Sequence, residues 1–447
     1  MTLAGLRAAL DGGEVSRTEL FTQTARAMAD LNTVLNLAIP AEDGEGSDVA
    51  PSLRGVRKGA LDGIPLAHKD MFDRRDHRCS FGARMRQQRP PRRTATAITR
   101  LEAAGAVTFG ALQMAEYALG PTGHNLVFGD CRNPWNPDHV TGGSSSGSAA
   151  AVAAGIVAGS LGSDTGGSIR LPAACCGVTG LKPSWGAVDA AGAMPLSASL
   201  DCVGPIARSV DDCALLFDLI AARPPAKPFD GQVRIGYAVR AAGRPVSPIV
   251  EQAVRSAVDM LAATGMPASE AVLPDIARLH GLADLIQKVD SSTVHLAGLQ
   301  SRRHLYSEHV RKRLSGGLFV PAIAYHQALR ERPAHVARFV RQSMADIDVL
   351  VIPTLAFPTP TRAETDERRL AGTFERVAAM TGWTRWLSYL GVPVLALPCG
   401  IDANGMPIGM QLVGRPNSEH LLFHVGRIFQ SVTDWHMRKP PHFAHIL

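Results

Sequence analysis

Residues 141–148 read Thr-Gly-Gly-Ser-Ser-Ser-Gly-Ser, and residues 162–170 read Gly-Ser-Asp-Thr-Gly-Gly-Ser-Ile-Arg. Between them lies a run of Ala, Val and Gly, which predicts a closely packed helix of small residues. Glycines let backbone N–H groups converge at low steric cost, and serines supply hydroxyls that act as nucleophiles or proton relays. Two Gly-Gly-Ser turns on either side of one small-residue helix therefore indicate acyl-transfer chemistry.

The second turn has the composition of an oxyanion site. The consecutive amides of Thr165, Gly166 and Gly167 predict an anion-accepting nest, with Ser168 beside it. Such a donor is worth about 2.7–4 kcal/mol to a tetrahedral transition state, which gives these glycines a chemical rationale. A single Gly-Gly-Ser is usually only a tight turn, so the prediction also needs a base.

Lys69 is the candidate base. Residues 61–70 read Leu-Asp-Gly-Ile-Pro-Leu-Ala-His-Lys-Asp, in which a short apolar strand leads into a lysine within an arginine-rich chain. Burial among neutral groups lowers a lysine pKa from ~10.4 to about 7–8, where the neutral amine can accept a proton. The alternative is a lysine that extends towards solvent and pairs with Asp70 or Asp73.

The chain has 447 residues, 46% of them hydrophobic and few aromatic, and contains no internal repeat. Its patterns predict one α/β domain over residues 1–447, with a central mixed β-sheet covered by helices on both faces. We expect an N-terminal helical hairpin (1–36), a core with the motifs (61–215), a variable and mostly helical substrate-shaping region (224–345) and a C-terminal return to the sheet (346–447). Strands are expected at 348–353, 393–398 and 410–413.

Charge, cysteines and hydropathy exclude several classes of protein. The net charge is +6, but the basic clusters at 84–93, 302–303 and 311–313 lack the interleaved aromatic residues of a nucleic-acid platform. We interpret them as solvated loops. The seven cysteines have no disulfide or metal-site spacing, and Cys175 and Cys176 are expected in the core. No signal core, membrane span or nucleotide-binding loop is evident, so we expect a cytoplasmic protein with no membrane or nucleic-acid partner and no cofactor.

Motifs along nearly the whole chain resemble those of the amidase signature enzymes. They occupy residues 142–155, 162–173, 176–177, 180–183, 398–400 and 407–414, together with the segment around Lys69. The spacing also agrees, with 144 − 69 = 75 residues from the lysine to the first serine and 168 − 144 = 24 between the serines. The resemblance implies the amidase signature fold and a triad in which Ser168 is the nucleophile, Ser144 the bridging serine and Lys69 the base. In the family a cis peptide precedes the bridging serine, here Gly143–Ser144.

The resemblance further implies a hydrolase that converts a small-molecule amide into an acid and ammonia or an amine, without a metal. The oxyanion would be bound by the amides of Thr165, Gly166, Gly167 and Ser168. Asp164 and Arg170 are interpreted as structural supports of the nucleophile turn, and residues 117–125 as a wall of the acyl pocket. Nothing in the sequence identifies the substrate, and a homo-oligomer remains open.

Two alternatives stay open. One is a component similar to the A subunit of a glutamine-dependent tRNA amidotransferase, although Ala187 occupies a position where an arginine is frequent. The other is an α/β-hydrolase, because residues 143–147 also fit Gly-x-Ser-x-Gly with Ser145 as the nucleophile. That nucleophile elbow must follow a hydrophobic strand, and the preceding segment, Asn-Pro-Asp-His-Val-Thr at 136–141, is a poor strand with a proline.

Overall fold

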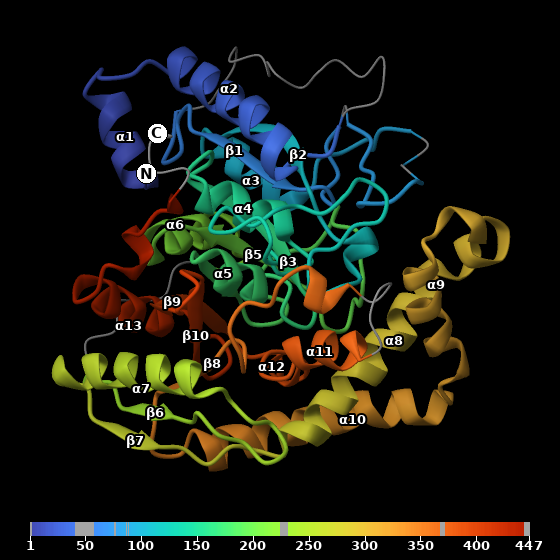
Figure 1. The fold of residues 1–447 in the computed structure, drawn as a ribbon, viewed down its shortest axis with the longest axis vertical. Coiled ribbons are helices and arrows are strands. Elements are labelled where there is room, and N and C mark those ends of the chain that lie inside the picture. The colour runs from blue at the N-terminus through green and yellow to red at the C-terminus, as the bar shows by residue number, and fades with distance from the viewer. Residues whose placement is uncertain are drawn as a thin grey trace.

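A large mixed β-sheet runs through the middle of the computed structural model (Figure 1). The model describes residues 2–40, 58–75, 77–85, 87, 89–223, 231–366 and 372–441. In spatial order the eight strands are β3 (Gly159–Asp164), β5 (Cys202–Ala207), β4 (Thr179–Lys182), β9 (Val394–Ile401), β10 (Pro407–Val413), β8 (Val349–Pro353), β6 (Ile235–Tyr237) and β7 (Ala268–Glu270). Neighbours from β3 to β8 are antiparallel, whereas β6 pairs in parallel with both β8 and β7.

A second sheet of two parallel strands, β1 (Pro65–Lys69) and β2 (Val107–Leu112), lies beside the edge strand β3. All five residues of β1 are buried, as expected for a short apolar strand covered on both sides. The strand ends at Lys69, so the lysine is carried to the edge of the main sheet where β3 also ends.

Helices cover both faces of the main sheet. Leu395 and Leu397 of β9 belong to a hydrophobic cluster with α6, α7 and α13, while Ala396 packs on the other face with α4 and α5. This alternation follows from the two-residue period of a strand. The helices are α1 (Leu3–Asp11), α2 (Arg17–Leu35), α3 (Thr96–Ala103), α4 (Ser146–Ala153), α5 (Arg170–Cys176), α6 (Val210–Ile220), α7 (Pro248–Ala263), α8 (Ile276–Ser301), α9 (Glu308–Ser315), α10 (Ala322–Arg338), α11 (Thr373–Met380), α12 (Arg385–Leu390) and α13 (Glu419–Ser431).

The helix between the two Gly-Gly-Ser turns is α4, and every one of its residues is buried. Gly147 shows why small residues are needed there. A Cβ at this position would lie 2.5 Å from Gln113 N and 2.5 Å from Leu37 O, which are backbone atoms that cannot move aside easily. The helix ends at Ala153, shortly before Gly155, which adopts a positive φ of 79°.

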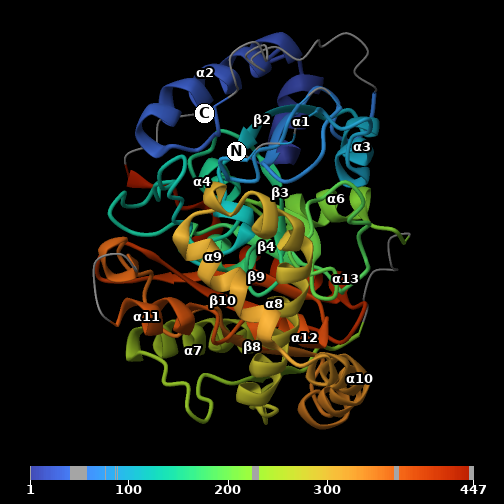
Figure 2. The same ribbon diagram turned by 90° about the vertical axis from the view of Figure 1, so that its right-hand side faces the viewer.

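The helical region α8–α10 forms one side of the molecule (Figure 2). Apolar residues of α8 recur every three or four positions and pack with α10 and α12 in one cluster. This cluster includes Ile276, Leu279, Ala283, Ile286, Ala328, Trp386 and Leu387. Figure 2 shows α8 and α9 in front of the strands of the core in this view.

The structure confirms a single α/β domain with a mixed sheet flanked by helices. The two helices expected within residues 3–36 are α1 and α2, and the strands expected near 348, 393 and 410 are β8, β9 and β10. Within the described ranges, no helix combines the length and apolarity that a membrane crossing requires.

Candidate functional site

Lys69 is buried at the end of β1, with a side chain directed at two hydroxyls. Only 1% of the residue is exposed, and its Nζ lies 2.8 Å from Ser144 Oγ and 2.8 Å from Ser163 Oγ. Burial lowers the pKa of Lys69 to about 7, although the negative charges of Asp201 and Asp164 act in the opposite direction. The amine is therefore largely neutral at mildly alkaline pH, as general-base chemistry requires.

The alternative interpretation of Lys69, an exposed partner of Asp70 or Asp73, does not match the structure. The Asp70 carboxylate accepts hydrogen bonds from the Ser80 N–H at 2.8 Å and from its hydroxyl at 2.5 Å. Asp73 accepts a hydrogen bond from the Gln87 amide at 2.7 Å. Both neighbouring acids are thus bound to other groups, and the lysine faces inward.

The first serine turn joins the core to the lysine. Ser144 is fully buried, and the Gly143–Ser144 peptide is cis, as the family resemblance implied. Ser145 directs its hydroxyl towards the Ser163 carbonyl at 3.4 Å, and Ser146 begins α4. No strand within the described residues leads directly into this turn, the preceding one being β2. The arrangement therefore does not fit a nucleophile elbow built on Ser145.

Ser168 lies on the second turn, between β3 and α5, and is partly exposed. It lines a pocket with about 320 Å³ of empty space, together with Thr165 and Gly166 of the same turn. The Ser168 carbonyl accepts a hydrogen bond from the Ser145 N–H at 3.3 Å, which ties the two serine turns together. The structure thus brings both serine turns and Lys69 to one place, and of Lys69, Ser144 and Ser168 only Ser168 lines this pocket.

One of the four expected oxyanion donors has another partner. The Gly167 N–H donates to Asp164 Oδ1 at 2.7 Å, so this amide is already hydrogen-bonded inside the protein. The expectation that Gly167 contributes its N–H to the oxyanion site is therefore corrected. Its glycine identity has a different reason, because φ is +136° and a Cβ would lie 2.5 Å from Thr384 Oγ1.

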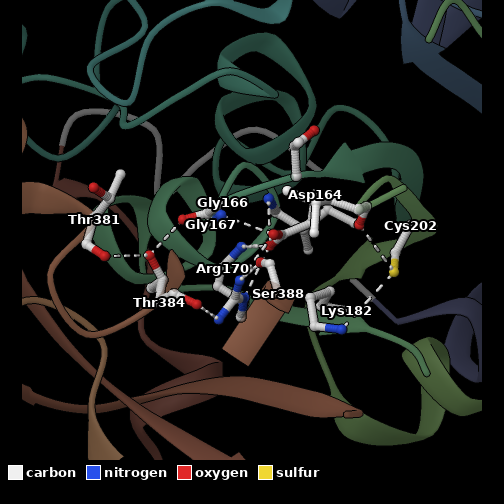
Figure 3. Close-up of polar contacts among 12 residues, drawn as sticks. Asp164, Gly166, Gly167, Arg170, Lys182, Cys202, Thr381, Thr384 and Ser388 are labelled. Atoms are coloured by element: carbon white, nitrogen blue, oxygen red, sulfur yellow. Dashed lines mark hydrogen bonds and ion pairs between the residues drawn. The ribbon is translucent and has the colours of Figure 1, made fainter. Parts of the chain in front are cut away.

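Asp164 and Arg170 form the support of the nucleophile turn (Figure 3). Both side chains are fully buried, and two parallel hydrogen bonds of 2.9 Å join the guanidinium to the two carboxylate oxygens. Burial alone would raise the pKa of Asp164, but the charge and hydrogen bonds of Arg170 outweigh it and hold that pKa below its usual value. The structural role predicted for this pair matches their contacts.

The same support extends from the turn to α12. Arg170 donates to the Thr384 carbonyl at 2.9 Å and to Ser388 Oγ at 3.0 Å, and Thr384 Oγ1 donates to the Gly166 carbonyl at 2.6 Å (Figure 3). A hydroxyl of the C-terminal part of the chain thereby holds the Gly166–Gly167 peptide group in the turn that carries Ser168.

Sequence reasoning missed two polar residues at this site. Ser163 is the second partner of Lys69, and its position five residues before the nucleophile on β3 was the available signal. Asp201 accepts a 2.5 Å hydrogen bond from Thr165 Oγ1 and two more from backbone amides, while burial raises the pKa of its carboxyl to about 6. No local motif marks Asp201, because it reaches the turn from the residue before β5.

The wall of the pocket combines distant segments. Ala118, Gly120 and Pro121 line it, and all three belong to residues 117–125, which were expected to form a wall of the acyl pocket. The other walls include Gln287 of α8, Arg313 of α9, and Thr381 and Arg385 around the start of α12. The interpretation of the basic cluster 311–313 as a solvated loop is wrong, because these residues belong to α9 and Arg313 lines the pocket.

Among the described residues, one group of three has metal-binding donors close together: Asp70, His77 and Cys79, whose ligand atoms lie within 4.8 Å of one another. All three are buried, and Cys79 directs its thiol to the Phe72 carbonyl at 3.1 Å. Asp70 of this group directly follows Lys69 in the sequence.

Known proteins with similar sequences and structures are amidases or components of amidotransferases. A family model described as Amidase matches residues 18–423. The chain is 35% identical to the A subunit of the glutamyl-tRNA(Gln) amidotransferase from Roseiflexus sp., over 98% of each chain. A solved structure described as an amidase superposes with a TM-score of 0.87 at 31% identity, covering 96% of this chain and 99% of that one. The 6-aminohexanoate cyclic dimer hydrolase bound to its substrate gives a TM-score of 0.84 at 25% identity, over 99% of each chain. The chain belongs to the amidase family and is an enzyme that acts on C–N bonds.

Proposed function

We propose that this amidase hydrolyses a small carboxylic amide to an acid and ammonia or an amine through an acyl-enzyme on Ser168. Ser144 relays the proton and Lys69 is the base. The observation that carries the proposal is the buried lysine amine, 2.8 Å from Ser144 Oγ, beside a turn that presents Ser168 to a pocket. A neutral amine in this position can take up a proton that a serine pair releases.

In the first half-reaction the Ser168 oxygen bonds to the substrate carbonyl carbon. The Ser168 proton passes to Ser144 as the Ser144 proton passes to Lys69, and the carbonyl becomes an oxyanion held by the amides of Thr165, Gly166 and Ser168. The proton then returns through Ser144 to the substrate nitrogen, the C–N bond breaks and the amine leaves. Water adds to the ester by the same proton path, and its hydrolysis releases the acid.

Ser163 has a positioning role in this proposal. A neutral lysine amine has two N–H donors and one lone pair. Donation of one N–H to Ser163 Oγ, at 2.8 Å, leaves the lone pair to accept the Ser144 proton. Ser163 thereby helps to orient the base without touching the substrate.

Labelling with a serine-directed fluorophosphonate tests the nucleophile. Intact-mass analysis and peptide mapping should show one adduct, located on Ser168, and the Ser168→Ala protein should show neither adduct nor amide turnover. The Ser145→Ala variant is the matched control, because Ser145 belongs to the adjacent turn and should still allow labelling. An adduct on Ser145 in the unmodified protein would contradict the proposal.

The second candidate function is that of an amidotransferase A subunit, which the names of the similar sequences favour. An enzyme that acts alone should release ammonia from simple amides as purified protein. If simple amides and glutamine are both left intact while Ser168 accepts the fluorophosphonate, the chain depends on a partner subunit.

We assign the protein to the cytoplasm, with a small amide as its partner and no membrane or nucleic-acid partner. All seven cysteines are free and buried, which suits a reducing compartment. Fractionation of cells that express the protein at its natural level would test the location.

A further inference from the structure

The pocket at Ser168 contains two cationic side chains. Its described lining residues are Ala118, Gly120, Pro121, Thr165, Gly166, Ser168, Leu171, Leu196, Gln287, Arg313, Thr381 and Arg385. Among these residues Arg313 and Arg385 carry positive charge and none carries negative charge. A pocket of this composition favours an anion in its interior.

Arg385 lies directly against the nucleophile turn. Its Nε would be 3.3 Å from a Cβ placed on Gly166, so the guanidinium covers the turn from the α12 side. This Nε is buried and has no hydrogen-bond partner in the protein, whereas Nη1 donates to Asp284. One donor of a mostly buried guanidinium therefore remains to be satisfied beside the pocket.

Asp284 is bound both by Arg385 and by Lys288, whose Nζ is 2.7 Å from the other carboxylate oxygen. One acid thus serves two cations. Arg313 adds a further positive charge close enough to Arg385 to lower its pKa, after burial, which is the larger cause. An anion placed between the two arginines would relieve this repulsion and gain charge-assisted hydrogen bonds.

We propose that the substrate is a small amide that carries a carboxylate and no ammonium group, such as the monoamide of a short dicarboxylic acid, with the carboxylate held by Arg385 and Arg313. This inference rests on the proposed function and names the class of its substrate. The absence of a lining carboxylate in the described pocket leaves an α-ammonium group without a counter-charge. The space of about 320 Å³ is at the small end of ligand pockets.

The test compares matched substrates by kcat/KM. Glutaramic acid is compared with 5-oxohexanamide, in which an acetyl group replaces the carboxylate, and with L-glutamine, which adds an α-ammonium group. We expect glutaramic acid to exceed 5-oxohexanamide by about 100-fold and glutamine by at least tenfold. Equal values for glutaramic acid and 5-oxohexanamide would overturn the carboxylate site, and a preference for glutamine would overturn the exclusion of the ammonium group.

Variants connect the preference to the arginine. In Arg385→Met the ratio of kcat/KM for glutaramic acid over 5-oxohexanamide should fall at least tenfold, and in Arg385→Lys it should fall less. The ratio is used because a change in folded fraction affects both substrates equally. Arg311→Met is the control, since Arg311 lies on α9, as Arg313 does, but does not line the pocket, and its ratio should stay within twofold. An unchanged ratio in folded Arg385→Met would overturn the proposal.

A labelling experiment distinguishes failure of the carboxylate site from failure of the proposed function. If no amide is turned over, protection of Ser168 from the fluorophosphonate by glutarate still measures the anion site. Glutarate should slow labelling of the unmodified protein at concentrations where 2,6-heptanedione has no effect, and Arg385→Met should remove the difference. Labelling of Ser168 without selective protection contradicts the anion site alone, whereas absence of any Ser168 adduct contradicts the proposed function.

Discussion

The core at residues 61–215 and the helical region around α8–α10 contribute different kinds of side chain to the site around Ser168. The core contributes short or fully buried groups, such as Lys69 at 1% exposure and Ser144 at 0%. The helical region contributes long and partly exposed side chains, namely Gln287 from α8, which packs on α12, and Arg313 from α9, which packs on α8. Groups of the first kind are positioned by their surroundings, and groups of the second kind can be exchanged without rebuilding the core. The difference suggests that reaction chemistry and substrate choice are carried by separate parts of the chain.

The largest expected effect is on the base. Lys69→Arg should lower kcat/KM by about 10³–10⁴-fold, nearly as much as Lys69→Ala, because a guanidinium stays protonated and cannot accept the Ser144 proton. Steady-state kinetics with glutaramic acid would measure the loss, and circular dichroism would confirm the fold. Lys312→Arg, whose side chain is exposed on α9 and does not line the pocket, is the control and should retain activity. Near-normal turnover by folded Lys69→Arg would exclude Lys69 as the base.

The next effect is on stability, and it tests whether the core depends on its buried contacts. Asp164→Asn leaves the fully buried Arg170 without its counter-charge, which should lower the free energy of unfolding by about 3–5 kcal/mol. Asp11→Asn removes an exposed partner of Arg7 on α1 and should cost about 0.5 kcal/mol or less. Chemical denaturation of the three proteins would show this contrast. Equal losses in both variants would mean that the buried pair does not stabilise the turn.

A smaller effect is expected where the two parts of the site meet. Thr384→Val removes the hydrogen bond to the Gly166 carbonyl, worth about 0.5–1.5 kcal/mol, so kcat should fall by up to about tenfold with little change in KM. Thr433 follows α13, away from the pocket, and its hydroxyl donates a similar 2.8 Å hydrogen bond to the Phe429 carbonyl. Thr433→Val is therefore the control. A change in KM alone would place Thr384 in substrate binding instead.

The smallest expected effect is that of chelation. Because the proposed reaction uses hydroxyls, an amine and backbone N–H groups, dialysis against EDTA should leave kcat/KM within about twofold. The group formed by Asp70, His77 and Cys79 makes the experiment informative, because it is the place where a metal next to Lys69 would bind. Loss of activity on chelation, followed by recovery with one divalent ion, would contradict a metal-free reaction.

Local sequence patterns were sufficient to predict part of the site and part of the fold. Lys69, Ser144 and Ser168 lie in local motifs whose glycines and serines suit acyl-transfer chemistry. Spacing and family resemblance were therefore enough to identify them as candidate site residues. The apolar runs of β8, β9 and β10 likewise predicted the C-terminal part of the sheet. Local pattern was also sufficient for the helices α1 and α2.

The remaining site residues depend on tertiary contacts. Arg313 belongs to a basic run that resembles any solvated helix face, and Arg385 gains its place only because α12 packs against α8. The hydrogen bond from the Gly167 N–H to Asp164 depends on the conformation of the turn. The sequence of the turn therefore did not show that this amide already has a partner. Side chains that function through long-range packing carry no short-range signal.

The pH dependence of Ser168 labelling by a fluorophosphonate tests the central claim most directly, because it reports the Lys69-assisted attack without needing the natural substrate. Burial lowers the pKa of Lys69 to about 7, so the amine is protonated and inactive below that pH and neutral above it. The labelling rate should therefore fall about tenfold per pH unit below pH 7, rise through pH 7 and level off at mildly alkaline pH, and Lys69→Arg should label slowly at every pH. A rate that is flat across neutral pH, or a Lys69→Arg protein that labels as fast as the unmodified one, would contradict the account.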